Sequence, residues 1–190
     1  MGRRYTRVDS SASDNPSDPH PFPLGFDFAL SLGYPVELLR SLPQSSVARF
    51  TGLSNVSVFA EIPAGSIVLD LGCGGGSDSL IAAAKAGPGG RVYGVDFSTS
   101  MLSQACAGAA ESGATNVEFR EAEGQQIPFA DATFDVALVN GIFNLNRNRS
   151  GLLQELARVI RPGGVLYGGE IVLCEPMDDE ERAGLLNWFS

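Results

Sequence analysis

The sequence predicts an α/β fold built on a doubly wound, mostly parallel sheet, and two observations lead to this prediction. From residue 62 onward, short apolar segments alternate with segments of helical character, an order that requires crossover connections between parallel strands. The apolar segments contain few polar residues, which is typical of strands that are covered on both faces of a sheet. The expected strands are 67–69, 92–95, 117–119, 134–140 and 165–173, and the expected helices are 77–86, 98–112, 150–160 and 178–189.

The composition predicts one domain with a substantial core, because 44% of the 190 residues are hydrophobic. The 13 basic and 22 acidic residues leave a net charge of −9, which argues against a nucleic-acid surface or a polybasic membrane anchor. No apolar run approaches the roughly 20 residues that cross a bilayer, and the first residues lack the apolar core of a signal peptide. We expect a cytoplasmic protein. Its three cysteines are too scattered for a disulfide framework or a zinc site, so we expect no bound metal.

Three regions are expected along the chain. Residues 1–23 are rich in Ser, Asp and Pro without periodicity and predict a disordered tail. Residues 24–61 predict a cap of short helices, one after Pro35 and a weak one over residues 45–50. Residues 62–190 form the main domain.

A glycine loop follows the first expected strand, in the segment IVLDLGCGGGS over residues 67–77. Gly72, Gly74 and Gly76 carry no Cβ, so the backbone can turn sharply and approach a ligand. The helix that follows directs its N–H groups and partial positive charge toward the same place. This strand, loop and helix predict a ligand-binding turn, with a ligand-free flexible loop as the alternative.

The residues around the loop distinguish between two nucleotide ligands. The dinucleotide fingerprint places a glycine at its sixth position, where this chain has Ser77. Asp70, two residues before the first glycine, would repel a pyrophosphate but suits a ligand with a cationic amino group. S-adenosylmethionine, which carries an amino group and a sulfonium, is therefore favoured over NAD.

A second carboxylate supports a nucleoside ligand. Asp96 ends the second strand, 20 residues after Gly76, which is the separation expected of an acid that accepts hydrogen bonds from ribose hydroxyls. Phe97 or Met101 could then lie against the adenine. The alternative for Asp96 is an acid that only caps the strand end or the next helix.

With these motifs in order, residues 62–173 resemble class I S-adenosylmethionine-dependent methyltransferases. The Asp70–Gly76 loop, Gly94-Val95-Asp96 and the segment EGQQIPF over 123–129 match the family, and RVIRPGG over 158–164 is common in its ubiquinone/menaquinone-biosynthesis branch. The resemblance implies a Rossmann-like fold and S-adenosylmethionine as cofactor, with Glu123 accepting from the adenine amino group. The cofactor-binding residues that it implies are Asp70, Gly72, Cys73, Gly74, Gly76, Asp96, Phe97, Met101, Glu123, Gly124 and Asn140.

A narrower resemblance is to the arsenite methyltransferase branch, carried by residues 33–35, 50–55 and 139–145. Members of that branch bind trivalent arsenic through cysteine thiolates, one of them directly after the Asn that is here Asn140. This chain has Gly141 at that place.

The three cysteines offer little toward arsenic, which needs soft thiolate ligands. Cys73 lies inside the cofactor loop, and Cys106 is expected to be buried in a helix. Cys174, at the end of the fifth strand, is expected to be a core or rim residue, with a substrate-facing thiol as the alternative. The resemblance therefore implies the fold and the cofactor, and the methyl acceptor is left as a small molecule, metalloid or quinol-like.

Catalytic residues are only weakly indicated, because methyl transfer requires mainly orientation from the protein. Asn140 and Asn144 follow the fourth strand, Glu170 lies in the expected fifth strand, and Tyr34 of the cap is a lid candidate. For the two asparagines the alternative is a pair of loop caps, and for Glu170 it is a paired buried acid.

The family's sheet has seven strands, whereas five are expected here, so the last two strands are expected to be lacking. The unpaired edge of the fifth strand would then invite pairing with a second copy in a homodimer. Besides a small-molecule methyltransferase, two functions stay open: a non-catalytic methyltransferase-like binding module, and an NAD-binding Rossmann protein.

Overall fold

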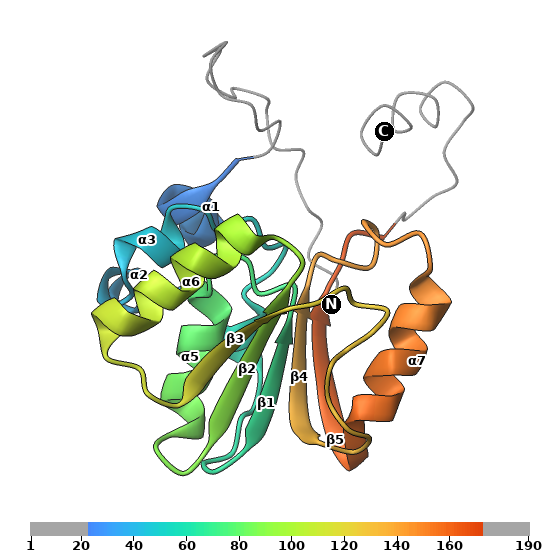
Figure 1. The fold of residues 1–190 in the computed structure, drawn as a ribbon. Helices are drawn as coiled ribbons and strands as arrows, with labels where there is room; N and C mark the ends of the chain where they lie inside the picture. Colours follow the sequence, from blue (N-terminus) through green and yellow to red (C-terminus); the bar gives the residue numbers. More distant parts are fainter. Residues whose placement is uncertain (1–22, 173–190) are drawn as a thin grey trace, which may run out of the picture.

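The computed structural model describes residues 23–172. The predicted tail up to residue 22, the helix predicted over 178–189 and Cys174 lie outside these residues. Five parallel strands form one sheet in the order β3-β2-β1-β4-β5 (Figure 1). The strands are β1 (Ile67–Leu71), β2 (Arg91–Asp96), β3 (Val117–Glu121), β4 (Phe134–Asn140) and β5 (Ile160–Gly169). This confirms the predicted α/β class with a parallel sheet.

Helices cover both faces of the sheet. They are α1 (Gly25–Ser31), α2 (Val36–Ser41), α3 (Gln44–Val47), α4 (Val56–Phe59), α5 (Ser77–Ala86), α6 (Thr99–Ser112) and α7 (Arg149–Val159). Helices α5 and α6 lie on one face and α7 on the other (Figure 1). The strand order reverses between β1 and β4, and ligands of open α/β sheets bind outside the carboxyl ends of the strands at such a point.

Side chains of the central strands alternate between two separate hydrophobic cores, one on each face of the sheet. Val68 and Leu138 point to one face and pack with Ala82 of α5. Leu69 points to the other face and packs with Leu152 of α7. All five side chains have no exposed surface, which explains why the strands read as continuous apolar runs.

The first four helices form a cap with a small core of its own. Tyr34 and Phe50 meet edge to face with ring centroids 4.9 Å apart. Ile81 of α5 belongs to the same cluster, so the cap packs directly on the helix that follows the glycine loop. Among residues 23–172 no helix combines the length and apolar character that crossing a bilayer requires.

Three details differ from the sequence predictions. Strand β5 begins at Ile160, directly after α7, and ends at Gly169, because a register shift between Phe134 and Val136 accommodates the Arg-Pro-Gly-Gly turn. Glu170 therefore follows the strand rather than lying within it. Cys106 is exposed, because the buried face of α6 is formed instead by Leu102, Ala105, Gly108 and Ala109. The weak helix expected over 45–50 is α3, which ends at Val47, after which the chain turns and buries Phe50.

Candidate cofactor site

The glycine loop joins β1 to α5 at the carboxyl edge of the sheet. Gly72, Gly74 and Gly76 have φ values of 77°, 52° and 85°, a region that side chains disfavour. A Cβ at Gly74 would meet no atom within 4 Å, so the backbone is open there. A Cβ at Gly75 would lie 2.9 Å from the Ser46 carbonyl oxygen, so the cap closes over the other side of the loop.

The Asp96 carboxylate is fixed beside this loop. One of its oxygens accepts from the Gly74 N–H at 2.9 Å, and the other accepts from the Ser98 N–H at 2.9 Å. Each carboxylate oxygen has a further lone pair for a ligand hydroxyl. Phe97 is 77% exposed next to it, and Met101 lies partly buried in the first turn of α6.

Asp70 lies in β1, two residues before the first glycine of the loop, and is 2% exposed. Its carboxyl group accepts from the Ser79 hydroxyl at 2.5 Å. Burial, reinforced by the neighbouring Asp78 charge, raises the pKa of Asp70 to about 8. Burial and the nearby Asp70 carboxylate also raise the pKa of the Cys73 thiol, so Cys73 is a neutral thiol and its contribution to the loop is its backbone.

Asp78 is the site residue that sequence reasoning missed. In the first turn of α5 its buried carboxylate accepts from the Tyr34 hydroxyl at 2.6 Å, from Asn140 Nδ2 at 3.0 Å and from the Ser57 hydroxyl. Burial raises the pKa of Asp78, and burial together with Asp78 raises the pKa of Tyr34. The one available signal was an acid at a helix N-terminus, because the partners come from distant segments.

Asn140 joins the cap to the sheet through its side-chain amide. Its Oδ1 accepts from the N–H groups of Leu53 and Ser54 at 2.8 and 3.1 Å, and its Nδ2 donates to the Ser54 carbonyl at 2.8 Å and to Asp78. These four contacts use the hydrogen-bonding capacity of the amide.

Asn144 and Glu170 bind each other at the end of the sheet. Asn144 Nδ2 donates to a Glu170 carboxylate oxygen at 3.0 Å and to the Ile171 carbonyl at 2.7 Å, and Glu170 also accepts from the Phe143 N–H at 2.7 Å. The structure thus gives both residues the role of closing the loop after β4.

Glu123 and Gly124 lie in the loop between β3 and β4, beside Asp96. The Ala122 N–H donates to the Asp96 carbonyl at 3.1 Å, which brings the start of this loop to the end of β2. The Glu123 side chain is exposed. Asp96, the glycine loop and Glu123 therefore meet at one edge of the sheet, although they are far apart in the sequence.

A cavity of about 40 Å³ lies between the cap and the glycine loop. Its walls include Asp70, Asp78, Asn140, Gly74 and Arg49. Arg49 forms no ion pair with any residue of the described chain. The cavity thus presents acidic groups and one guanidinium to the same small space.

Comparison with known proteins assigns the family. A model of the methyltransferase domain matches residues 62–186. The chain belongs to this family. Over 149 residues, 78% of the chain, it is 36% identical to an arsenite methyltransferase of Halobacterium salinarum, covering 38% of that protein. Over 128 residues, 67% of the chain, it is 35% identical to a demethylmenaquinone methyltransferase of Lactococcus lactis, covering 46% of it.

Solved methyltransferase structures share the fold. The arsenic(III) S-adenosylmethionine methyltransferase of Chlamydomonas reinhardtii matches with a TM-score of 0.66 and 26% identity over 88% of this chain and 55% of that one. An S-adenosylmethionine-dependent methyltransferase of Aquifex aeolicus matches with a TM-score of 0.56 and 25% identity over 84% of both chains. The chain spans less than half the length of the two curated relatives named above.

Proposed function

We propose that this methyltransferase domain binds S-adenosylmethionine across the glycine loop and transfers its methyl group to a small molecule. The observation that carries the proposal is the buried Asp70 carboxyl group. It borders the small cavity together with Asp78, and its protein donor is the neutral Ser79 hydroxyl. An ammonium group bound there would lower the raised pKa of both buried acids and favour their ionised forms, whereas those ionised forms would repel a pyrophosphate. This charge pattern supports S-adenosylmethionine over NAD.

Each end of the cofactor has a matching group on the chain. Asp70 faces the amino group and Arg49 the carboxylate, because a guanidinium that has no ion pair among residues 23–172 suits a zwitterion in an acidic pocket. Asp96 accepts from the ribose hydroxyls, and Glu123 with the Gly124 backbone contacts the adenine. The cavity of about 40 Å³ is of the size of one small charged group, so the nucleoside lies over the open backbone at Gly74.

The bound cofactor supplies an electrophilic methyl group on its sulfonium. The chain's own residues orient it and exclude water, because Asn140 binds the cap to the end of β4 and Tyr34 of the cap binds Asp78 of α5. A general base is needed only when the acceptor arrives protonated, because the proton that the methyl group replaces must then be accepted. Asn144 and Glu170 already bind each other and shape the acceptor side of the site.

The acceptor is proposed as a small metalloid or a quinol, the two classes suggested by the names of the relatives. Exposed apolar side chains near the carboxyl ends of the strands support the quinol. They are Phe97, Leu145, Ile171 and Val172. Among residues 23–172 only one cysteine, the buried Cys73, borders the cavity, and Cys106 lies outside its walls, so the described residues supply no pair of thiolates for arsenic.

A two-part experiment tests the proposed function. S-adenosylhomocysteine should raise the melting temperature of the chain in a thermal-shift titration, and NADH should not. Tritiated methyl groups should then pass from S-adenosylmethionine to a demethylmenaquinol analogue or to glutathione-complexed arsenite. Stabilisation without transfer to either acceptor would favour a non-catalytic binding module, and stabilisation by NADH alone would overturn the proposal.

We further propose that the outer edge of β5 pairs with a second copy. Among the described residues β5 pairs with β4 alone, and Val165 and Leu166 are 44% and 38% exposed. An unpaired, apolar strand edge favours pairing with another chain. Light scattering after size exclusion should give twice the chain mass, and a monomer at all concentrations would contradict this proposal.

A further inference from the structure

We propose that Arg158 and Glu155 of α7 are positioning residues for the adenine end of the cofactor site. They hold the loop between β3 and β4, residues 122–133, here called the adenine-side loop. The inference rests on the proposed function, because it takes Glu123 of this loop as the adenine contact. An ion pair on α7 thus sets the position of Glu123.

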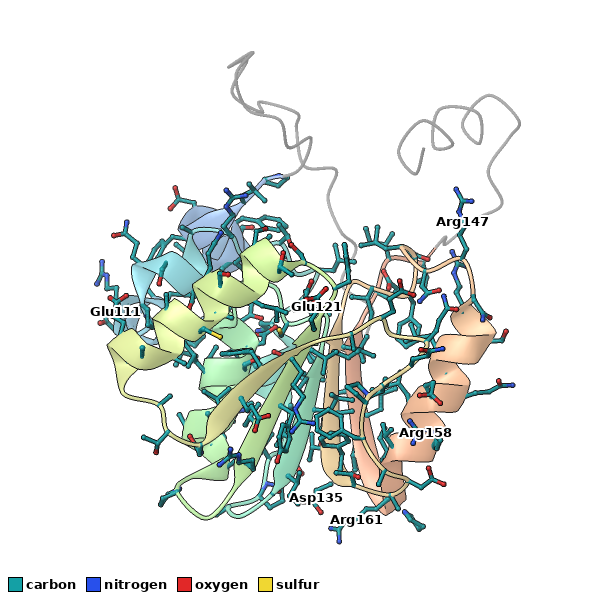
Figure 2. All side chains as sticks on the ribbon, viewed as in Figure 1. Glu111, Glu121, Asp135, Arg147, Arg158 and Arg161 are labelled. Carbon is teal, nitrogen blue, oxygen red and sulfur yellow. The ribbon has the colours of Figure 1, made fainter. Side chains whose placement is uncertain are left out.

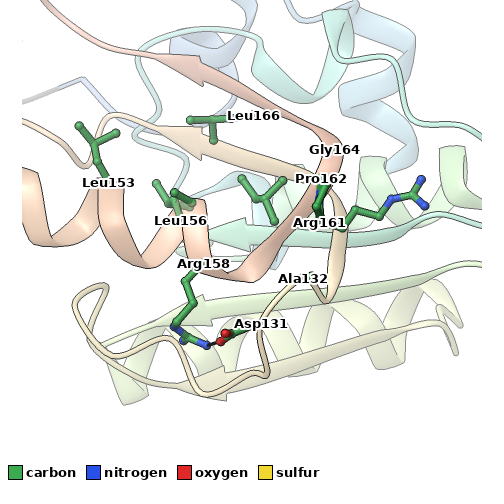
Figure 3. A pocket seen from close by; sticks show the side chains of 11 residues that line it. Asp131, Ala132, Leu153, Leu156, Arg158, Arg161, Pro162, Gly164 and Leu166 are labelled. Atoms are coloured by element: carbon green, nitrogen blue, oxygen red, sulfur yellow. Dashed lines mark hydrogen bonds and ion pairs between the residues drawn. The ribbon is translucent and has the colours of Figure 1, made fainter.

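The Arg158 guanidinium binds this loop at three separate points. It donates to the carbonyl oxygens of Ile127 and Phe129 at 2.9 and 2.8 Å and to an Asp131 carboxylate oxygen at 2.9 Å. The Arg158 backbone carbonyl also accepts from the Ala132 N–H at 2.8 Å. Figure 3 shows the side chain reaching from α7 to Asp131 across the space below the helix.

Glu155 lies one turn earlier on α7 and binds the same loop. The side chains of Arg158 and Glu155 are together called the clamp. Its carboxylate accepts from the Ile127 N–H at 3.0 Å and from the Arg158 guanidinium at 2.8 Å through both of its oxygens. The two side chains thus bind both the N–H and the C=O of Ile127. A planar guanidinium supplies several donors in a fixed geometry, which a lysine cannot.

The position of Glu123 depends on this clamp. Its side chain is exposed, and its backbone carbonyl accepts from the Gln126 N–H at 3.0 Å. Glu123 is therefore held through the turn that leads to Ile127. A Cβ at Gly124 would lie 2.9 Å from the Leu152 side chain, again on α7. Helix α7 consequently fixes the position of the adenine-side loop relative to the sheet.

The clamp stays charged over the pH range of an assay. Hydrogen bonds from Arg158 lower the pKa of Glu155, and Glu155 and Asp131 raise the pKa of Arg158. Its contribution should therefore be independent of pH between about 6 and 9, unlike that of Asp70.

The experiment compares two ligands on matched variants. S-adenosylhomocysteine and S-inosylhomocysteine differ at the adenine amino group, which the second ligand replaces by oxygen. We expect the unmodified chain to prefer the adenine ligand at least about tenfold, and Glu123→Gln to reduce this preference. Arg158→Lys and Glu155→Gln should reduce it to a similar extent, with little change in binding of the inosine ligand.

Arg161→Lys is the control, since Arg161 pairs with Asp135 at 2.7 Å near the starts of β4 and β5 (Figure 2), and no ion pair among the described residues joins it to the adenine-side loop. It should leave the ligand preference unchanged. If Glu123→Gln leaves the preference intact, the proposed adenine contact fails and takes this inference with it. If Glu123→Gln reduces the preference but Arg158→Lys and Glu155→Gln do not, or weaken both ligands equally, the positioning role alone is overturned.

Discussion

At the scale of single residues, the buried Asp70 carboxyl group dominates the electrostatics of the site. Its pKa lies near 8 rather than near 3.8, because the group is buried and faces Asp78 and Asp96. The unfolded chain releases this proton near pH 4, whereas the folded chain keeps it to about pH 8. Folding is therefore favoured at low pH, and this contribution is lost as the pH rises from about 4 to 8.

The ligand-free protein should accordingly become less stable between pH 6 and pH 8, and Asp70 should add little further change up to pH 9. Asp70→Asn keeps a partner for Ser79 and removes the buried charge, so it should flatten this dependence and exceed the unmodified chain in free energy of unfolding at pH 9 by more than about 1 kcal/mol. Asp78 is shifted in the same direction, so some slope remains. Urea titrations across this range measure the effect, and parallel curves for the two proteins would refute it.

Asp96 should contribute through its charge and its geometry. Asp96→Asn removes one ligand-facing acceptor and should weaken S-adenosylhomocysteine binding by about 10- to 100-fold. Glu61→Gln removes an exposed carboxylate outside the cavity walls and should have no effect. Equal affinities for the two variants in equilibrium dialysis would show that Asp96 only caps the strand end.

The positions of Asp70 and Asp96 near the carboxyl ends of β1 and β2 could be predicted, because each lies in an apolar strand segment at a fixed distance from the glycines. Their contacts with the cofactor stay predictions. The role of Asp78 could not be predicted from the sequence, because its hydrogen-bond partners Tyr34 and Asn140 approach it only in the folded chain. The same holds for Asn140. Its position after the fourth strand suggested a contact with the cofactor or substrate, whereas its amide forms hydrogen bonds with the cap.

At the scale of elements, the attachment of the cap to the sheet depends on a few buried hydrogen bonds. Asn140→Ala should leave the Leu53 and Ser54 N–H groups without an acceptor and cost about 2–3 kcal/mol of stability. Amide hydrogen exchange should accelerate at these two residues, and S-adenosylhomocysteine should bind more weakly, because neighbouring cap residues line the cavity.

Asn116→Ala provides the comparison for this prediction. Asn116 Nδ2 donates to the carbonyls of Ala83 and Gly87 at the opposite end of α5. Its loss should reduce stability without altering exchange at residues 53–54. Unchanged exchange at these residues in Asn140→Ala would contradict the cap attachment.

The strands that are buried on both faces of the sheet could be predicted from the sequence. Strands β1, β2 and β4 are buried on both faces, so their apolar runs marked them. The boundary between α7 and β5 was not predictable, because Ile160 starts a strand only through pairing with Phe134. Short helices such as α3 depend on packing rather than on local pattern.

At the scale of the whole molecule, the net charge of −9 should assist a cationic ligand. S-adenosylmethionine carries one more positive charge than S-adenosylhomocysteine, so raising salt from about 0.05 to 0.5 M should weaken the binding of the first more than the second. Isotherms at several salt concentrations measure the ratio of the two dissociation constants. A ratio that is independent of salt would mean that only local contacts sense the sulfonium.

A calorimetric titration of the folded chain with S-adenosylhomocysteine tests the central assignment most directly. One site per chain with a dissociation constant below about 100 μM is expected, with competition by S-adenosylmethionine and no heat from NADH. Absence of heat from either adenosyl ligand, on protein shown to be folded, would contradict the assignment of the glycine loop and its flanking carboxylates to this cofactor.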